Sequence, residues 1–287
     1  MPTLIVLTLR SCLHICLLFL ATPLLAQAGL PQSSNVPGGV AIIPLSDVLA
    51  DANKPLSWFG DQAVLVTTEH KQWYAVVGLA LDMKPGPYAL HVKTGNEMMA
   101  LPFVVNDKNY PEQRITLKDT SKVELSAEDE ARVVRELAAI TEIKRHWREE
   151  ENTDLAFIIP AQGRLSGNFG LRRFFNGEAR SPHAGLDVAV ARGTPIKASA
   201  QGLVLAVDDY FFNGKTIFVD HGNGLITMYC HLEQSDVHSG EAVEKGQQLG
   251  LSGQSGRATG PHLHWSVILN GALVDPQLFI PAKHRAK

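Results

Sequence analysis

Two histidines separated by one leucine, His262 and His264, stand at the start of an apolar run that ends at Leu269. The run predicts a β-strand over 261–269. Because side chains on a strand alternate between faces, both imidazoles project from one face and the leucine from the other. Paired imidazoles are costly in an apolar core and suit a metal site. The fold must therefore bring further ligands to this face.

Short β-rich runs separated by turn residues fill most of the chain. In 38–118 they alternate with clusters of glycine, proline and asparagine, a spacing typical of a β-sandwich that is roughly immunoglobulin-like. From residue 155 the pattern returns with more glycine and predicts an antiparallel sheet without an interior helix. The expected strands cover 40–43, 63–68, 73–79, 88–92, 98–105, 114–117, 202–207, 215–219, 225–231 and 261–269.

One helix is expected between the two β-rich regions. Ser126 and Asp129 form a capping-box pattern with acidic residues in the first turn. An apolar stripe then recurs at spacings of three and four residues, through Val133, Leu137, Ile140, Lys144 and Trp147. This predicts a helix near 127–149. The expected fold is mainly β, with an N-terminal β-sandwich-like domain (29–120), a linking helix (121–152) and a C-terminal antiparallel β-sheet domain (153–287).

Residues 1–28 have the pattern of a secretory signal: Arg10, an apolar stretch, and small residues around Ala26 and Ala28. We expect cleavage there, a location in the periplasm or cell envelope, and no stable membrane span afterwards; the alternative is an uncleaved anchor. Cleavage would leave Cys230 as the single cysteine, so no internal disulfide could form. The net charge is -3 and no lysine- or arginine-dense run occurs, which gives no support for nucleic-acid binding.

A second motif upstream carries the missing ligands. His183 and Asp187 are four residues apart, and the proline and glycine around them oppose a helix. The pair would therefore straddle a loop and the start of a strand. Two histidines and an aspartate form a three-ligand set that leaves one zinc position open for water. His231, on the strand expected over 225–231, is a further candidate at the same site.

The order and spacing of these motifs over roughly the last 130 residues resemble the lysostaphin-like, LytM-type zinc endopeptidases, which are peptidoglycan hydrolases. The N-terminal half resembles the β-domain that precedes such peptidases in some bacterial envelope proteins. The matching motifs are His183-x-x-x-Asp187, Gly193-Thr-Pro195, Gly202-x-Val204, Asp220-His-Gly-Asn-Gly224, Tyr229-x-His231-Leu, Val243-x-Lys-Gly-Gln247 and Gly253-x-Ser-Gly-Arg-Ala-Thr-Gly-Pro-His-Leu-His264.

The resemblance implies one Zn²⁺ per chain, held by His183, Asp187 and His264, with His231 and His262 as unligated catalytic histidines. One of these two would take a proton from water, and the other would stabilise the oxyanion or protonate the leaving amine; the sequence leaves the assignment open. The implied substrate is the stem-peptide cross-link of peptidoglycan, a D-alanyl–diaminopimelate bond first and a glycine bridge second. An envelope regulatory protein is a further partner that the resemblance allows.

Two other functions compete with this one. Some relatives have lost ligands and serve as non-catalytic envelope adaptors that bind the wall and activate amidases, whereas all five site residues are present here. The N-terminal β-domain could instead be a wall- or partner-binding module. Among other polar residues, His221 is expected to be a turn or wall residue. Asn168, Arg172 and Arg173 either line the cleft or have a structural role.

Overall fold

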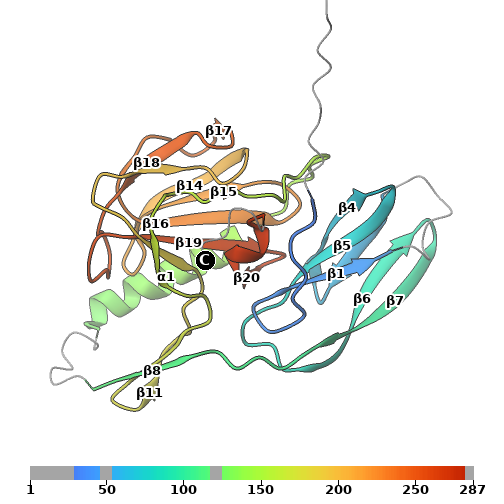
Figure 1. Ribbon diagram of the computed structural model, residues 1–287, viewed down its shortest axis with the longest axis horizontal. Helices are drawn as coiled ribbons and strands as arrows, with labels where there is room; N and C mark the ends of the chain where they lie inside the picture. The colour runs from blue at the N-terminus through green and yellow to red at the C-terminus, as the bar shows by residue number, and fades with distance from the viewer. Residues whose placement is uncertain (1–28, 46–53, 117–124, 282–287) are drawn as a thin grey trace, which may run out of the picture.

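The computed structural model describes residues 29–45, 54–116 and 125–281 of the 287-residue chain. Over these residues the fold is mainly β with a single α-helix, as the sequence predicts (Figure 1). The predicted signal peptide, residues 1–28, lies outside the described residues. Within the described part of the chain, no helix is both long and apolar enough to cross a membrane.

Two small antiparallel sheets form the N-terminal half, in the strand orders β1-β5-β4 and β3-β2-β6-β7. Buried side chains of both sheets, including Val77 and Val92, share one apolar core, so the sheets form the expected sandwich. The strands are β1 (Val40–Pro44), β2 (Leu56–Phe59), β3 (Gln62–Ala63), β4 (Leu65–Glu69), β5 (Gln72–Gly78), β6 (Gly86–Thr94) and β7 (Glu97–Val105).

A ten-stranded sheet forms most of the C-terminal half, with the central order β17-β14-β15-β16-β19-β12-β9. One face packs on a large core that includes Tyr229 and Trp265, and the other on a smaller cluster around Phe218 and Met228. The elements are β9 (Arg164–Gly167), β12 (Leu186–Ala189), β13 (Pro195–Lys197), β14 (Gly202–Tyr210), β15 (Gly214–Asp220), β16 (Leu225–Ser235), β17 (Ala242–Val243), β18 (Gln248–Ser252), β19 (Leu263–Leu269), β20 (Ala272–Val274) and the 3₁₀-helix η2 (Pro276–Phe279).

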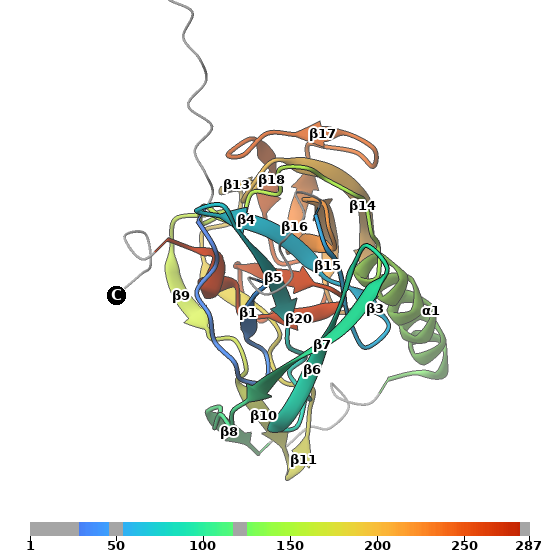
Figure 2. The ribbon, with the colours of Figure 1, turned by 90° about the vertical axis from the view of Figure 1, so that its right-hand side faces the viewer.

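Helix α1 (Ala127–Lys144) packs beside this sheet, against the smaller cluster, through Ile140 and Ile143 (Figure 2). Its Ser126 N-cap accepts a hydrogen bond from the backbone of Asp129, as the capping pattern predicts. The predicted end near residue 149 is wrong, because the helix stops at Lys144. Trp147, expected on the apolar stripe, lies beyond that end and its ring packs on Gly224. Leu137, also expected on the stripe, is 54% exposed.

The N-terminal sandwich is joined to the large sheet by a shared core and by one asparagine. Val40 and Val76 belong to the same buried cluster as the C-terminal sheet. Asn270, in the tight turn between β19 and β20, accepts a hydrogen bond from the Gly78 backbone N–H (2.6 Å) and donates one to the Gly78 carbonyl oxygen (3.1 Å). The sandwich therefore abuts the end of β19 that lies away from His264.

A third sheet, in the order β11-β10-β8, brings the segment after the sandwich against a hairpin that precedes His183. Strand β8 (Glu112–Ile115) pairs in parallel with β10 (Arg172–Phe175), which pairs with β11 (Glu178–Ala179). The sequence analysis did not predict this parallel pairing, which links residues far apart along the chain.

Candidate metal centre

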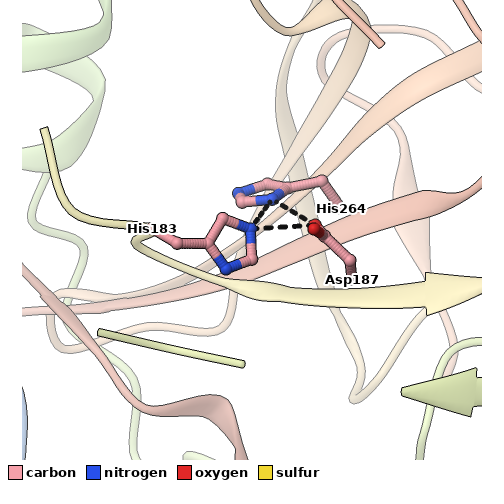
Figure 3. Close-up of side chains that lie close together, drawn as sticks. All are labelled: His183, Asp187 and His264. Carbon is pink, nitrogen blue, oxygen red and sulfur yellow. Dashed lines mark hydrogen bonds and ion pairs between the residues drawn. The ribbon is translucent and has the colours of Figure 1, made fainter. Parts of the chain in front are cut away.

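Three side chains converge at the edge of the large sheet. Asp187 on β12 lies directly opposite His264 on β19, and His183 precedes β12 in a loop. The Asp187 Oδ1 atom is 2.9 Å from His183 Nε2 and 2.9 Å from His264 Nδ1, and these two nitrogens are 3.0 Å apart (Figure 3). The loop-and-strand placement of the His183–Asp187 pair agrees with the sequence prediction. The structure therefore brings together the three residues that the sequence nominated as metal ligands.

A backbone contact of His183 and the absence of a side chain at Gly167 fix this arrangement. His183 Nδ1 lies 2.9 Å from the Asn168 carbonyl oxygen, which can only accept a hydrogen bond, so Nδ1 carries the proton and Nε2 faces Asp187. Gly167 on β9 is paired with Asp187, and a Cβ at this glycine would lie 2.2 Å from the carboxylate. The glycine therefore leaves the space that the carboxylate occupies. Sequence reasoning missed this role of Gly167.

His231 and His262 lie beside the three-residue cluster. Their ring centroids are 4.6 Å apart, and the ring of His231 is 6.1 Å from that of His264. The Nδ1 atom of His231 is 2.9 Å from the Ser255 carbonyl oxygen, and that of His262 is 2.8 Å from the Gly260 carbonyl oxygen. Each Nδ1 is therefore protonated in the neutral ring, and each Nε2 has a lone pair directed elsewhere.

A bulge in β16 turns His231 toward the site. Cys230 lies opposite His264, so both side chains project from the same face of the sheet, and Cys230 is buried there. Strict alternation would send His231 to the opposite face. The pairing of β15 with β16 shifts register at this point, and His231 adopts a positive φ of 60°. Such bulges redirect side chains and are common beside active sites.

The electrostatics favour neutral rings at His231 and His264 and an ionised carboxylate at Asp187. Burial opposes ionisation of Asp187, but its close contacts with the rings of His183 and His264 outweigh this effect and hold its pKa below the ordinary value. Burial lowers the pKa of His264. Burial also lowers the pKa of His231 to about 4, against the opposing effect of its bond to the Ser255 carbonyl. An unprotonated nitrogen is the form that binds a metal or accepts a proton.

The remaining candidates occupy different positions. His221 is buried in the turn before β16, and its ring nitrogens lie 2.7 Å from the Gln201 carbonyl oxygen and 2.8 Å from Thr227 Oγ1, as expected for a turn or wall residue. Asn168 contributes its backbone to the site. Arg172 and Arg173 lie on β10, where Arg172 is paired with Glu112 and Arg173 contacts Gln113.

Comparison with known proteins agrees with this geometry. Residues 181–276 match the model of peptidase family M23, and residues 33–108 match the model of the M23 N-terminal domain. A crystal structure from Pseudomonas aeruginosa, assigned to the M23 peptidases, is 41% identical, covers 87% of this chain and 96% of its own, and superposes with a TM-score of 0.74. The chain belongs to peptidase family M23.

Curated relatives match less than half of this M23 peptidase. The peptidoglycan DD-endopeptidase ShyA of Vibrio cholerae is 39% identical over 120 residues, which is 42% of this chain and 28% of that protein. The DD-carboxypeptidase/endopeptidase Mpg of Neisseria meningitidis is 36% identical over 113 residues, 39% of this chain and 26% of that protein. The match thus spans under a third of each of these relatives.

The donor set of the M23 domain fits a divalent metal ion. Two neutral imidazoles and a carboxylate are common zinc ligands, and three protein ligands leave a position open in a catalytic site. The three donor atoms are 2.9–3.0 Å apart, close to the edge of about 3.3 Å expected for a tetrahedron with zinc–ligand bonds of about 2.0–2.1 Å. The side chains are only 9–15% exposed, so little of the cluster is open to solvent.

Proposed function

We propose that the chain is a zinc metalloendopeptidase of the bacterial envelope that hydrolyses peptide cross-links in peptidoglycan. One observation carries the proposal: His183, Asp187 and His264 place three donor atoms together, and the rings of His231 and His262 lie beside them, with His262 Nε2 3.8 Å from Asp187 Oδ1. The names of the curated relatives, which include DD-endopeptidases, support peptidoglycan as the substrate. A periplasmic location follows from the substrate and from the signal pattern of residues 1–28.

His183, Asp187 and His264 would hold the zinc ion, which when bound polarises water and the scissile carbonyl. His231 and His262 would manage the protons. Both rings are held through Nδ1–H, so each can accept a proton at Nε2 and become a donor. The ring that accepts the proton of the attacking water can then return it to the leaving amine.

The non-catalytic adaptor is the second candidate. Such a protein need not keep a complete constellation, whereas this chain has all five residues within one cluster and has a strained histidine at position 231. Strain of this kind is retained where a function requires it. The geometry therefore favours hydrolysis over an adaptor role.

We also propose that the chain works as a sandwich over 29–120, a linking helical segment over 121–152 and a catalytic unit over 153–287. The two family matches, over 33–108 and 181–276, support this division. The shared core around Val40 and Val76 argues that the sandwich stays docked on the catalytic sheet. An envelope regulatory protein would then bind to the assembled pair.

Mass spectrometry of the fragments released from purified sacculi tests the proposal. We expect the zinc-loaded protein to convert cross-linked muropeptides into monomers, with D-alanyl–diaminopimelate bonds cut before glycine bridges. Elemental analysis of the purified protein should give one zinc per chain. Two histidines and a carboxylate also suit iron(II), so iron in place of zinc would contradict the metal assignment. Intact cross-links after incubation with the zinc-loaded protein would contradict the activity.

A further inference from the structure

Ser266 connects the candidate ligand His264 to the backbone of the loop that carries His183. It lies two residues after His264 on β19, so both side chains project from the same face of the sheet. The serine is completely buried. Its Oγ atom is 2.9 Å from the carbonyl oxygen of Ala184 and 3.0 Å from His264 Nε2.

These two contacts fix the position of a proton. A carbonyl oxygen only accepts, so the single hydroxyl proton of Ser266 is donated to Ala184. The hydroxyl oxygen must then accept from His264, which places a proton on Nε2. A neutral imidazole carries one proton. The Nδ1 atom of His264 is therefore left with a bare lone pair, directed at Asp187 and His183.

The alternative tautomer would be favoured if Ser266 had no hydroxyl. Asp187 Oδ1 lies 2.9 Å from His264 Nδ1, and a carboxylate attracts a proton to the nitrogen that faces it. A proton on Nδ1 would block the lone pair that a metal needs. Ser266 opposes this outcome by giving the Nε2 proton a buried acceptor.

Gly185 leaves space for the hydrogen bonds of Ser266 to His264 and Ala184. A Cβ at this position would lie 2.6 Å from both His264 Nε2 and Ser266 Oγ. Its φ lies outside the left-handed region, so steric room, and not backbone conformation, requires glycine here. The glycine therefore allows the loop backbone to approach the buried hydroxyl closely enough for the Ala184 bond.

We propose that Ser266 is a positioning residue that holds His264 in the Nε2–H tautomer and so presents Nδ1 to the metal. The role as a metal-site residue rests on the proposed function, but the tautomer can be measured without metal. Groups that orient a metal-binding histidine in this way typically change metal affinity by about 10–100-fold when removed.

Two measurements on the full chain test the proposal. Long-range ¹H–¹⁵N spectra of the metal-free protein report which ring nitrogen carries the proton, with the His264 signals identified by their loss in His264→Gln. We expect an Nε2–H ring in the unsubstituted protein and a shift toward Nδ1–H in Ser266→Ala. Competition with a chromophoric chelator should show about 10–100-fold weaker zinc binding for Ser266→Ala and restoration by Ser266→Thr, which keeps the hydroxyl.

Thr227→Val is the matched control. Thr227 is also completely buried and its hydroxyl contacts a histidine, His221, but that ring belongs to no metal cluster. The control should lose stability and keep the zinc affinity of the unsubstituted protein. Gly185→Ala, which crowds both partners, should weaken zinc binding in the same direction as Ser266→Ala while the far-ultraviolet circular dichroism stays unchanged.

The outcomes separate this inference from the proposed function. An unchanged His264 tautomer and an unchanged zinc affinity in Ser266→Ala would overturn the role of Ser266, even in an active enzyme. Equal losses of zinc affinity in Ser266→Ala and Thr227→Val would mean that the loss in Ser266→Ala comes from lower stability and not from the His264 tautomer. If the unsubstituted protein bound no zinc but showed the Nε2–H tautomer and its loss in Ser266→Ala, the proposed function would fail while the hydrogen-bond relay stood.

Discussion

Histidine and aspartate side chains lie at both ends of the large sheet, but their hydrogen bonding differs between the two ends. At one end, His231 and His262 each have one ring nitrogen on a backbone carbonyl, and their Nε2 atoms make no hydrogen bond to a described residue. At the other end, both ring nitrogens of His221 are hydrogen-bonded. There Asp220 is fully buried, accepts from the Gly222 N–H and is paired with Arg148 at 2.5 Å.

The contrast separates histidines that keep an available lone pair from a histidine whose two ring nitrogens are both hydrogen-bonded. A buried polar group stabilises a fold when all its hydrogen-bonding positions are satisfied. At the end with the candidate metal centre, lone pairs are left available and the backbone of His231 is strained, so this end favours function over stability. Substitutions at the candidate metal centre should therefore lower activity, and substitutions around His221 and Asp220 should lower stability.

The largest effect should come from His264→Ala. Removing this proposed ligand leaves two protein donors, which should abolish stoichiometric zinc binding. The release of muropeptides should fall by more than about 10³-fold, since in the proposed reaction both the activation of water and the polarisation of the carbonyl depend on the ion. Elemental analysis and muropeptide mass spectrometry would measure the two losses. One zinc per chain in the purified variant would contradict the ligand role of His264.

His231→Ala and His262→Ala should retain zinc and lose turnover by about 10²–10⁴-fold, the usual contribution of a positioned acid or base. Neither ring is among the three clustered donors, so metal binding should persist. These variants would differ from His264→Ala because they lose turnover while they keep the zinc ion. Loss of zinc in His231→Ala equal to that in His264→Ala would overturn the assigned roles.

The sequence was sufficient to predict that His183, Asp187 and His264 lie together, because their order and spacing carry this information. The His262–His264 alternation required both rings on one side, and both lie beside Asp187 although β19 itself begins at Leu263. The His183–Asp187 spacing required a loop entering a strand, which is observed. The long strands followed from continuous apolar runs.

Features set by tertiary contacts were not predictable in the same way. The bulge that redirects His231 depends on the pairing of β15 and β16, and the parallel strand β8 depends on a partner far along the chain. The helix was predicted too long because Trp147 continued the apolar spacing, whereas the ring packs on Gly224 beyond the helix end. The space that Gly167 leaves for the Asp187 carboxylate and the bond of Ser266 to the Ala184 carbonyl depend on neighbours that only the folded chain supplies.

At the structural end of the sheet, Arg148→Ala should lower the free energy of unfolding by about 2–3 kcal/mol. The substitution leaves the Asp220 carboxylate buried without its cation, although the side chain of Arg148 is 32% exposed, which reduces the effect. Arg192→Ala is the control, because its pair with Glu233 is exposed at the surface, where screening by solvent leaves a smaller contribution to stability. Urea unfolding would measure both variants, and equal losses would contradict the difference in burial.

The smallest effect should be a pH dependence of stability at His221. Burial lowers the pKa of His221 to about 4 in the folded chain, whereas the unfolded chain protonates near 6.5. Between these values the unfolded state binds more protons, so the contribution present above pH 6.5 is lost as the pH falls. At pH 5 the loss is about 2 kcal/mol. Urea unfolding of the metal-free protein at pH 5 and 7.5 should show this loss and its absence in His221→Asn. The other histidines are the same in both proteins, so their contributions cancel in the difference. Parallel pH profiles would mean that His221 is not held neutral in the folded chain.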